Sequence, residues 1–428
     1  MRLSNGLSVQ FSFRQLSPVW IALQFPGGRS TDPPTRIGRA VACLNALADD
    51  TNELTSSSTD ATVTVFVDPV RHGFRVRTSK AALDQTLARL STIFERRFVS
   101  PGKLASFVAA RRLALAQARA QPLSAAEAVQ ALVAFGGSHP EGSLETAETL
   151  GRITLDDCAE FLSRHLQPEN AELIAVGDVD AKHFEQRLRA RLDRLGSPTK
   201  ASSSLARLTT GVEPFPPIGG GRIHFIDVGQ TSAVVMMALS FTPAEDPAAV
   251  AASTLVAVGV KQAFAEALLP FAYRPYGTIR RFSGTDVRVY WALIESQGLI
   301  SALKAASAGF GQVKRYSPAL LSTPDVRGAA TFELIADLDR AEGLMSFFSG
   351  EYAIGAEGRL LPAGWASEVL TRLTSVGPSE IRTAQERISP DRMVYLVAGD
   401  GRALLPQLEA LVKEGLPGLA ALVVVKAD

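Results

Sequence analysis

The sequence has 428 residues with an ordinary globular composition and an almost balanced charge. Hydrophobic residues make up 46% of the chain and charged residues 20%, which excludes an intrinsically disordered protein. Lysine and arginine number 44 against 43 aspartates and glutamates, so the net charge of +1 provides no overall field for nucleic acid or an anionic membrane surface. We therefore expect no nucleic-acid partner, and the length favours at least two domains.

Strand and helix patterns alternate along the first half of the chain. Short segments rich in apolar and aromatic residues predict strands at residues 8–13, 19–25, 61–67 and 73–78. Apolar residues at helical spacing predict helices at residues 36–48, 82–94, 103–120, 124–134 and 155–165. Ser79 is the expected cap of the second of these helices, and Thr154 with Asp157 forms a capping box before the last.

The middle of the chain has the composition of a linker. Residues 201–221 lie in a stretch rich in Ser, Thr, Pro and Gly that begins at residue 197. They separate a predicted N-terminal domain of residues 1–200 from a predicted C-terminal domain of residues 222–428.

The two halves of the chain repeat each other in order. The segment LQPENAELIAVGD at 166–178 matches ISPDRMVYLVAGD at 388–400, and VWIALQFPGGRSTDP at 19–33 matches AVVMMALSFTPAEDP at 233–247. The second half also repeats the order of elements, with strands expected at 278–294 and 393–398. A repeat of this length indicates duplicated domains. Few strands and many helices in each half predict an α+β fold, in which helices cover one face of a mixed sheet.

No catalytic centre is visible from the residue types alone. No two of the five histidines have the i, i+4 spacing of a helical zinc site; they are His72, His139, His165, His183 and His224. Neither a Cys-x-x-Cys nor a Gly-x-Ser-x-Gly motif is present. Cys43 lies in the apolar stripe of a predicted helix, which favours packing. Cys43 and Cys158 allow at most one disulfide, so the cysteines indicate no redox compartment.

Membrane and export signals are not visible either. We find no run of the roughly 18–20 apolar residues that span a bilayer, and residues 1–6 lack the apolar stretch of a secretory signal. We therefore expect no membrane span and a cytoplasmic location, with a periplasmic location if a signal peptide has been removed.

Several segments together resemble the M16 family of zinc metallopeptidases, which includes pitrilysin and the mitochondrial processing peptidase. They are NGLSVQF at 5–11, LQFPGGRSTDPP at 23–34, RIGRA at 36–40, FGGSHPEG at 135–142 and LGRITLDDCAEFLSRHLQPENAELIAVGDVD at 150–180. The resemblance runs along nearly the whole chain. It implies two homologous α+β domains of M16 type joined by a linker, with two such subunits enclosing a chamber for peptides.

The same resemblance implies that the catalytic residues have been lost. In the family, a His-x-x-Glu-His motif on the helix after the Gly-Arg-Ser turn binds zinc through its histidines, its glutamate activates water, and a later glutamate is the third ligand. In this chain the three motif positions hold Val41, Leu44 and Asn45. Residues 96–126, where the third ligand is expected, contain no Asp or Glu. The resemblance thus implies an inactive homologue without a metal site or cofactor of its own.

Relatives also hold the substrate backbone with an Arg and a Tyr from the second domain. The corresponding region reads VGVKQAFAEALLPFAYRPYGTIRRF at 258–282, where the Arg position falls on Leu268 or Leu269. Arg274 and Tyr276 are the substrate-binding candidates that the resemblance leaves. The alternative is that they are solvated residues at the start of a strand.

The function implied by the resemblance is that of a non-catalytic subunit in a heterodimeric M16 peptidase. A partner subunit would carry the zinc, and the pair would enclose a peptide substrate. A narrower hypothesis is the inactive subunit of a bacterial protease that trims the peptide precursor in pyrroloquinoline quinone biosynthesis. The alternative is a solitary peptide-binding or scaffold protein with no protease partner, a use of the family known from the core proteins of the bc1 complex.

Overall fold

The computed structural model describes residues 1–13, 15, 18–54, 61–68, 71–136, 142–195, 221–241, 246–272, 276–282, 285–335, 365–388, 393–415 and 419–425. These residues form two compact units. Unit 1 comprises the described residues of 1–114 and 145–195, and unit 2 comprises those of 115–144, 221–335 and 365–425. The predicted linker at 201–221 lies outside the described residues except for Gly221. The boundaries of the predicted domains beside it therefore remain a prediction.

Unit 1 contains a sheet with the strand order β1-β5-β2-β4-β3 among its described residues. Its strands are β1 (Ser8–Phe13), β2 (Val19–Pro26), β3 (Val63–Val67), β4 (Arg71–Thr78) and β5 (Glu172–Gly177). β1 and β5 are parallel, and the other neighbours are antiparallel. The helices of unit 1 include α1 (Arg39–Leu54), α2 (Leu83–Arg96), α5 (Ala147–Gly151), α6 (Leu155–His165) and α7 (Ala181–Leu192). α3 (Pro101–Arg119) begins in unit 1 and ends in unit 2.

Most elements of unit 1 lie where local sequence predicts them, because their apolar residues repeat with the period of a strand or a helix. The capping box before α6 is confirmed, with Thr154 and Asp157 each accepting from the other's backbone N–H. Ser79 does not cap α2; its hydroxyl instead accepts from the N–H of Ala82, in the turn before the helix. α1 begins at Arg39 rather than at residue 36, because Pro34–Arg36 forms a separate 3-10 turn.

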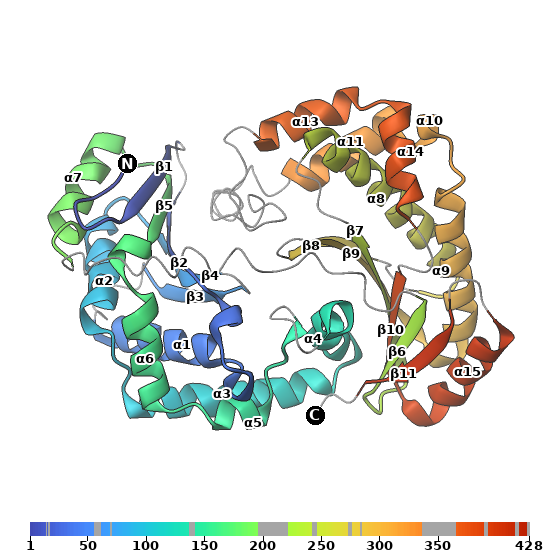
Figure 1. Cartoon of the computed structure of the whole chain (residues 1–428), viewed down its shortest axis with the longest axis horizontal. Helices are drawn as coiled ribbons and strands as arrows, with labels where there is room; N and C mark the ends of the chain where they lie inside the picture. Colours follow the sequence, from blue (N-terminus) through green and yellow to red (C-terminus); the bar gives the residue numbers. More distant parts are fainter. Residues whose placement is uncertain are drawn as a thin grey trace. The chain divides into compact units, whose positions relative to one another are not determined.

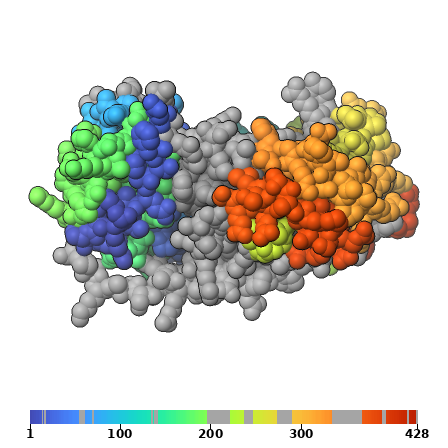
Figure 2. Space-filling view, turned by 90° about the horizontal axis from the view of Figure 1, so that it is seen from above, coloured from blue at the N-terminus to red at the C-terminus, as the bar shows by residue number. Residues whose placement is uncertain are grey.

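The helices of unit 1 cover one face of its sheet (Figure 1). Side chains alternate along a strand, so Ile21, Leu23 and Phe25 of β2 point to the same side as Phe74 and Val76 of β4, and all five are buried. At the other end of the sheet, Phe11 of β1 stacks on Phe184 of α7, with ring centroids 5.2 Å apart. Figure 2 shows the first residues of the chain (dark blue) beside the green segment that contains α7. Ser4 and Asn5 hydrogen-bond there to Asp193 and to the carbonyl of Leu192.

Unit 2 contains a second sheet with the order β11-β6-β10-β7-β9-β8. The strands are β6 (Arg222–Asp227), β7 (Ser232–Phe241), β8 (Tyr276–Phe282), β9 (Thr285–Glu295), β10 (Met393–Gly399) and β11 (Ala421–Val424). The helices are α4 (Pro122–Phe135), α8 (Pro247–Leu268), α9 (Leu299–Val313), α10 (Pro318–Leu321), α11 (Pro324–Ile335), α13 (Trp365–Ser375), α14 (Pro378–Glu386) and α15 (Gly401–Glu414). The main core lies between one face of this sheet and α8, α9 and α15.

The two units have the same topology. The strands β6, β10, β7, β9 and β8 repeat β1, β5, β2, β4 and β3 in chain order, in order across the sheet and in direction, and β11 is an addition at the edge. Each second strand leads to a long helix, α1 or α8, and the corresponding strands β5 and β10 lead to the helices α7 and α15. The predicted fold class is confirmed: two duplicated α+β domains, each with a mixed sheet covered by helices. Of the matching segments, residues 242–245 and 389–392 lie outside the described residues.

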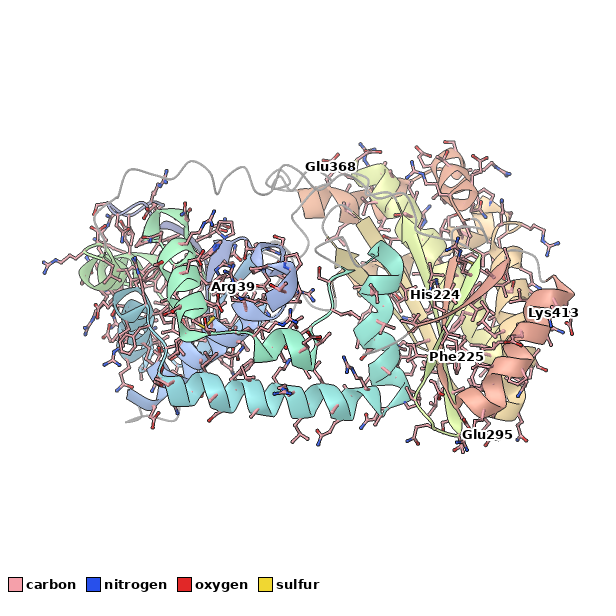
Figure 3. The ribbon with its side chains drawn as sticks, turned by 60° about the horizontal axis from the view of Figure 1, so that its bottom comes forward. Arg39, His224, Phe225, Glu295, Glu368 and Lys413 are labelled. Carbon is pink, nitrogen blue, oxygen red and sulfur yellow. A yellow bond between two sulfur atoms is a disulfide. The ribbon has the colours of Figure 1, made fainter. Side chains whose placement is uncertain are left out.

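α4 covers the second face of the unit 2 sheet. Ala125, Ala126, Val129 and Val133 of this helix pack in one apolar cluster on the sheet residues Ile226, Val234, Val289, Val394, Leu396 and Ala398. The helix was predicted correctly, but local sequence gave no sign that it packs on strands more than 85 residues away in the chain. Figure 3 labels His224 and Phe225, neighbours on β6. Phe225 belongs to the core on the α8 side, so His224 points to the α4 side.

α8 is long and apolar enough to cross a bilayer by length and composition alone. No uninterrupted apolar run marks α8 in the sequence, because polar residues such as Ser253, Thr254 and Lys261 interrupt the helix. In the structure 72% of its most apolar window is buried inside the unit. α8 is thus the central core helix of unit 2.

Candidate functional site

The turn between β2 and α1 is shaped by glycines and closed by one buried carboxylate. Gly27 and Gly28 have positive φ angles of 119° and 37°, which other residues rarely adopt. Asp32 then accepts hydrogen bonds from the backbone N–H groups of Gly38 and Ala40, both at 2.9 Å. These amides have no partner within the helix, so Asp32 stabilises the start of α1. Burial raises the pKa of Asp32 to about 6, although these hydrogen bonds and nearby Arg39 act in the opposite direction.

α1 carries the three positions of the family's metal motif, and their side chains offer no ligand set. Leu44 is fully buried, while Val41 and Asn45 are half-buried. The amide of Asn45 donates to the backbone carbonyl of Val41, at 2.7 Å, one turn earlier in the same helix. Val41 and Leu44 are apolar, and the amide of Asn45 is bonded within its own helix. These positions therefore provide neither an imidazole nor a carboxylate to hold zinc.

The region expected to supply the third ligand is α3. Its first turn is fastened to the end of α1, because Ser100 donates to Asp50 and Lys103 forms an ion pair with Glu53 at 2.7 Å. Asp50 and Glu53, at the end of α1, are therefore engaged in structural contacts. Among the described residues, no group of three or more His, Cys, Asp and Glu side chains is arranged to hold a metal ion.

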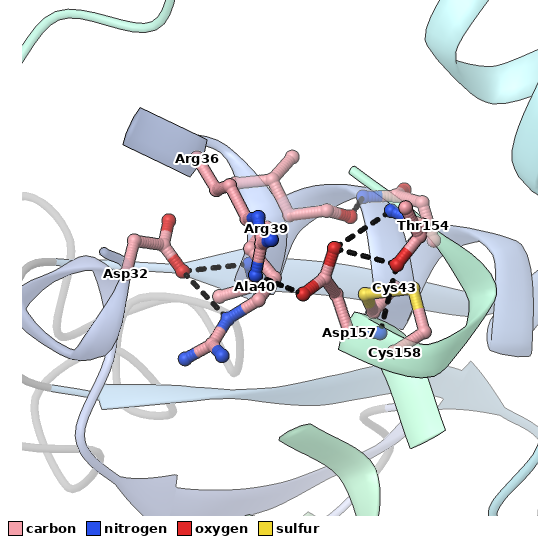
Figure 4. The surroundings of a disulfide bond; sticks show 10 residues. Asp32, Arg36, Arg39, Ala40, Cys43, Thr154, Asp157 and Cys158 are labelled. Carbon is pink, nitrogen blue, oxygen red and sulfur yellow. Dashed lines mark hydrogen bonds and ion pairs between the residues drawn. A yellow bond between two sulfur atoms is a disulfide. The ribbon is translucent and has the colours of Figure 1, made fainter. Parts of the chain in front are cut away.

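Cys43 and Cys158 form a disulfide that links α1 to the first turn of α6 (Figure 4). Both residues are fully buried, and 115 positions separate them in the sequence. The prediction that Cys43 serves packing alone is therefore wrong. The available sequence signal was weak: these are the only two cysteines, and each lies in the apolar stripe of a helix.

One ion pair beside the disulfide also links the start of α1 to α6. Asp157, beside the disulfide, forms an ion pair with Arg36 just before α1, and it accepts from the N–H and hydroxyl of Thr154. Figure 4 shows these contacts around the sulfur atoms. The helix that would carry the metal in a catalytic M16 domain is thus fixed by a covalent bond and polar contacts on its flank.

A cluster of buried histidines lies next to this region. His72 of β4 is fully buried and stacks on Phe25, and the ring of His165 at the end of α6 is 5.6 Å away from that of His72. Phe161 lies between these rings and Arg39, whose guanidinium is 5.3 Å from the Phe161 ring (Figure 3 labels Arg39). Burial lowers the pKa of His165 to about 4, with Arg164 and Arg39 adding to the effect. Burial, and then the neighbouring His165, lowers the pKa of His72 well below its usual value.

The remaining histidines do not join this cluster. His183 is exposed on α7 and contacts Asp180 at 2.9 Å. Burial lowers the pKa of His224 in unit 2 to about 4, with Arg222 adding to the effect. His139 lies outside the described residues.

We expect acid to destabilise unit 1 through His72 and His165. Unfolded histidines titrate near pH 6.5, whereas the folded pair stays neutral to a lower pH. The unfolded chain therefore binds more protons, and the unfolding free energy falls as the pH drops from about 6.5 to about 4, by at most about 1.4 kcal/mol per pH unit for each histidine. Asp32 acts oppositely: its raised pKa of about 6 means that its own contribution grows as the pH falls from about 6 to about 4. Because two histidines destabilise the fold at low pH and only one carboxyl stabilises it, we expect a net loss of unfolding free energy as the pH falls.

Urea unfolding at pH 7.5 and pH 5.0 measures this effect. His72→Leu removes one titrating group and should reduce the difference between the two pH values, while the exposed control His183→Gln should leave it unchanged. Equal stability of the wild-type chain at both pH values would show that the histidines are not held neutral.

The predicted substrate-binding residues are only partly covered by the structure. Arg274 lies outside the described residues. Tyr276 is the first residue of β8, an edge strand, where its backbone pairs with that of Trp291 on β9. Their role in binding remains a prediction.

Residues 152–313 match the family model described as the peptidase M16 inactive domain. A search of curated proteins found no match.

Solved structures share the fold over almost the entire chain. A chain of complex III2 from Candida albicans has a TM-score of 0.75 at 15% identity, covering 98% of this chain and 97% of that one. The peptidase M16 inactive domain from Pseudomonas fluorescens has a TM-score of 0.71 at 16% identity, covering 94% and 98%. An M16-like peptidase from Alicyclobacillus acidocaldarius has a TM-score of 0.72 at 13% identity, covering 94% and 97%. At such identities the similarity shows the fold.

The domain matched at residues 152–313 and the shared fold confirm the predicted resemblance to the M16 family.

Proposed function

We propose that this chain is the non-catalytic subunit of a heterodimeric M16 zinc peptidase, in which it encloses and helps to hold the peptide that its partner cleaves. The observation that carries this proposal is α1, where Val41, Leu44 and Asn45 replace the zinc ligands and the base while the helix itself remains intact. The matched domain, described as inactive, supports a non-catalytic role. A subunit that only encloses substrate needs the fold but not the metal. The experiment that tests the proposal is co-expression with an M16 chain that carries an intact His-x-x-Glu-His motif.

A second candidate function is that of a scaffold without a protease partner. The similarity to a chain of complex III2 from Candida albicans favours it, because that chain is part of a large assembly and matches the fold along its whole length. The two functions differ in one simple observation, namely whether a neighbouring gene encodes an M16 chain with an intact metal motif.

Narrower proposals on the pathway, the substrate and the location accompany the first. Trimming of the pyrroloquinoline quinone precursor is the proposed pathway, and a peptide precursor is the proposed substrate. For the location, the buried Cys43–Cys158 bond favours an oxidising compartment such as the periplasm over the cytoplasm, because disulfides persist where thiols are not kept reduced.

We expect the isolated chain to bind no stoichiometric zinc and to hydrolyse no peptide. Metal analysis of the purified chain after dialysis against zinc measures this directly. The triple variant Val41→His, Leu44→Glu, Asn45→His should also remain inactive, because residues 96–126 still supply no third carboxylate. About one tightly held zinc ion per wild-type chain would contradict the proposal.

A further inference from the structure

α3 is rich in apolar residues, yet one of its faces is exposed within unit 1. The side chains of this face lie at positions i, i+4, i+7 and i+8 of the helix and are those of Ala105, Ala109, Arg112 and Leu113. Leu113 is 61% exposed, which is unusual for a large apolar side chain in the middle of a helix. Figure 3 shows α3, the long cyan helix, with no described element along its lower side. We call these four residues the α3 face.

The opposite side of α3 holds the helix on unit 1. Leu104 is buried and Val108 is half-buried on that side. Arg111, on the same side, forms an ion pair with Glu145 through two hydrogen bonds of 2.8 and 2.9 Å. These contacts fix the position of the helix, so the α3 face is presented to solvent in a defined orientation. An apolar face that is fixed but uncovered is typical of a surface that binds a partner.

The charge around the α3 face is positive. Residues 96–126 contain six Lys and Arg residues and no Asp or Glu. Lys103 is paired with Glu53 at the end of α1, whereas Arg112 forms no ion pair with any described residue. The guanidinium of Arg112 is therefore available to a carboxylate of another chain, which it can bind through two hydrogen bonds.

We propose that the α3 face is the surface on which the zinc-bearing partner subunit docks, through a helix that places a carboxylate on Arg112 and apolar side chains around Leu113. Ala105 and Ala109 are small and one turn apart, so a second helix can pack against α3 at the usual axial distance of about 8–10 Å. Pairing with the same face of a second copy is disfavoured, because the basic segments at 96–126 would meet with like charges. The inference rests on the proposed function, since it names the surface that the proposed partner covers.

Isothermal titration calorimetry of this chain with an M16 chain that carries an intact His-x-x-Glu-His motif tests the inference. Leu113→Asp and Arg112→Glu should each raise the Kd at least about tenfold, and the affinity of the wild-type chain should fall as salt is added. The matched controls are Leu155→Asp on α6 and Arg191→Glu on α7, which change exposed residues of the same types and should leave the Kd within about twofold. Thermal unfolding of each variant establishes that it is folded.

A photo-crosslinker on the α3 face gives a second readout. With p-benzoylphenylalanine in place of Ala109, we expect a covalent link to the partner subunit, and mass spectrometry should locate it on a helix that carries Asp or Glu. The same group in place of Arg191 on α7 should give no link to the partner.

The outcomes separate this inference from the proposed function. If the wild-type chains bind each other but the Kd is unchanged for either Leu113→Asp or Arg112→Glu, or position 109 gives no cross-link, the inference is wrong and the proposed heterodimer stands. If the wild-type chains do not bind each other, both are wrong. A homodimer of the isolated chain that Leu113→Asp dissociates would assign the α3 face to a second copy and would also overturn the inference.

Discussion

Removing this chain from its complex with a zinc-bearing M16 subunit should lower the kcat/KM of peptide cleavage by at least about tenfold. An extended peptide must be held on both sides of the scissile bond for the metal-bound water to attack it, and correct positioning alone contributes large factors to a rate. A zinc subunit by itself leaves one side of the peptide to solvent. Tyr276 and Arg274 are the residues of this chain that we expect to act near the partner's metal.

The experiment is co-expression of the two chains, followed by gel filtration and activity assays with and without this chain. A specific interface of this kind should bury more than about 1,000 Å² and survive gel filtration as a one-to-one complex. Tyr276→Phe and Arg274→Ala should raise KM or lower kcat without dissociating the pair. If the zinc subunit alone cleaves as fast, or if the two chains never co-elute, the scaffold function replaces the accessory one.

Removing the disulfide should cause the largest loss of stability. For the variant Cys43→Ala, Cys158→Ala we expect an unfolding free energy lower by about 3–5 kcal/mol. The bond closes a loop of 115 positions, so it strongly restricts the unfolded chain, and both sulfur atoms are fully buried, so their loss also leaves space between α1 and α6. Urea unfolding of the oxidised wild type, the reduced wild type and the double variant separates these two effects.

The control for the disulfide experiment is Thr154→Ala, which removes one capping interaction from the same helix. We expect it to cost about 1 kcal/mol and to leave the cross-link in place. Peptide mapping of unreduced protein should recover Cys43 joined to Cys158. Oxidised and reduced wild-type chains that unfold at the same urea concentration would contradict a stabilising disulfide.

Local sequence patterns located most of the elements and indicated the duplication. Periodicity located β1, β2, α6 and β10 to within a residue or two, because the signals for strands and helices lie within a few neighbouring residues. The repeated segments at 166–178 and 388–400 indicated two copies of one domain, which the matching strand orders confirm. The loss of ligands at Val41, Leu44 and Asn45 was also visible in the sequence, since it depends only on which residue stands at each position.

Contacts between distant segments of the chain became visible only in the folded structure. The Cys43–Cys158 bond, the pairing of His72 with His165 and the packing of α4 on the unit 2 sheet each join residues far apart in the chain. A local pattern gives the period of a single element, so the elements could be predicted from the sequence. Contacts between elements depend on how separate elements pack together, so these contacts could not.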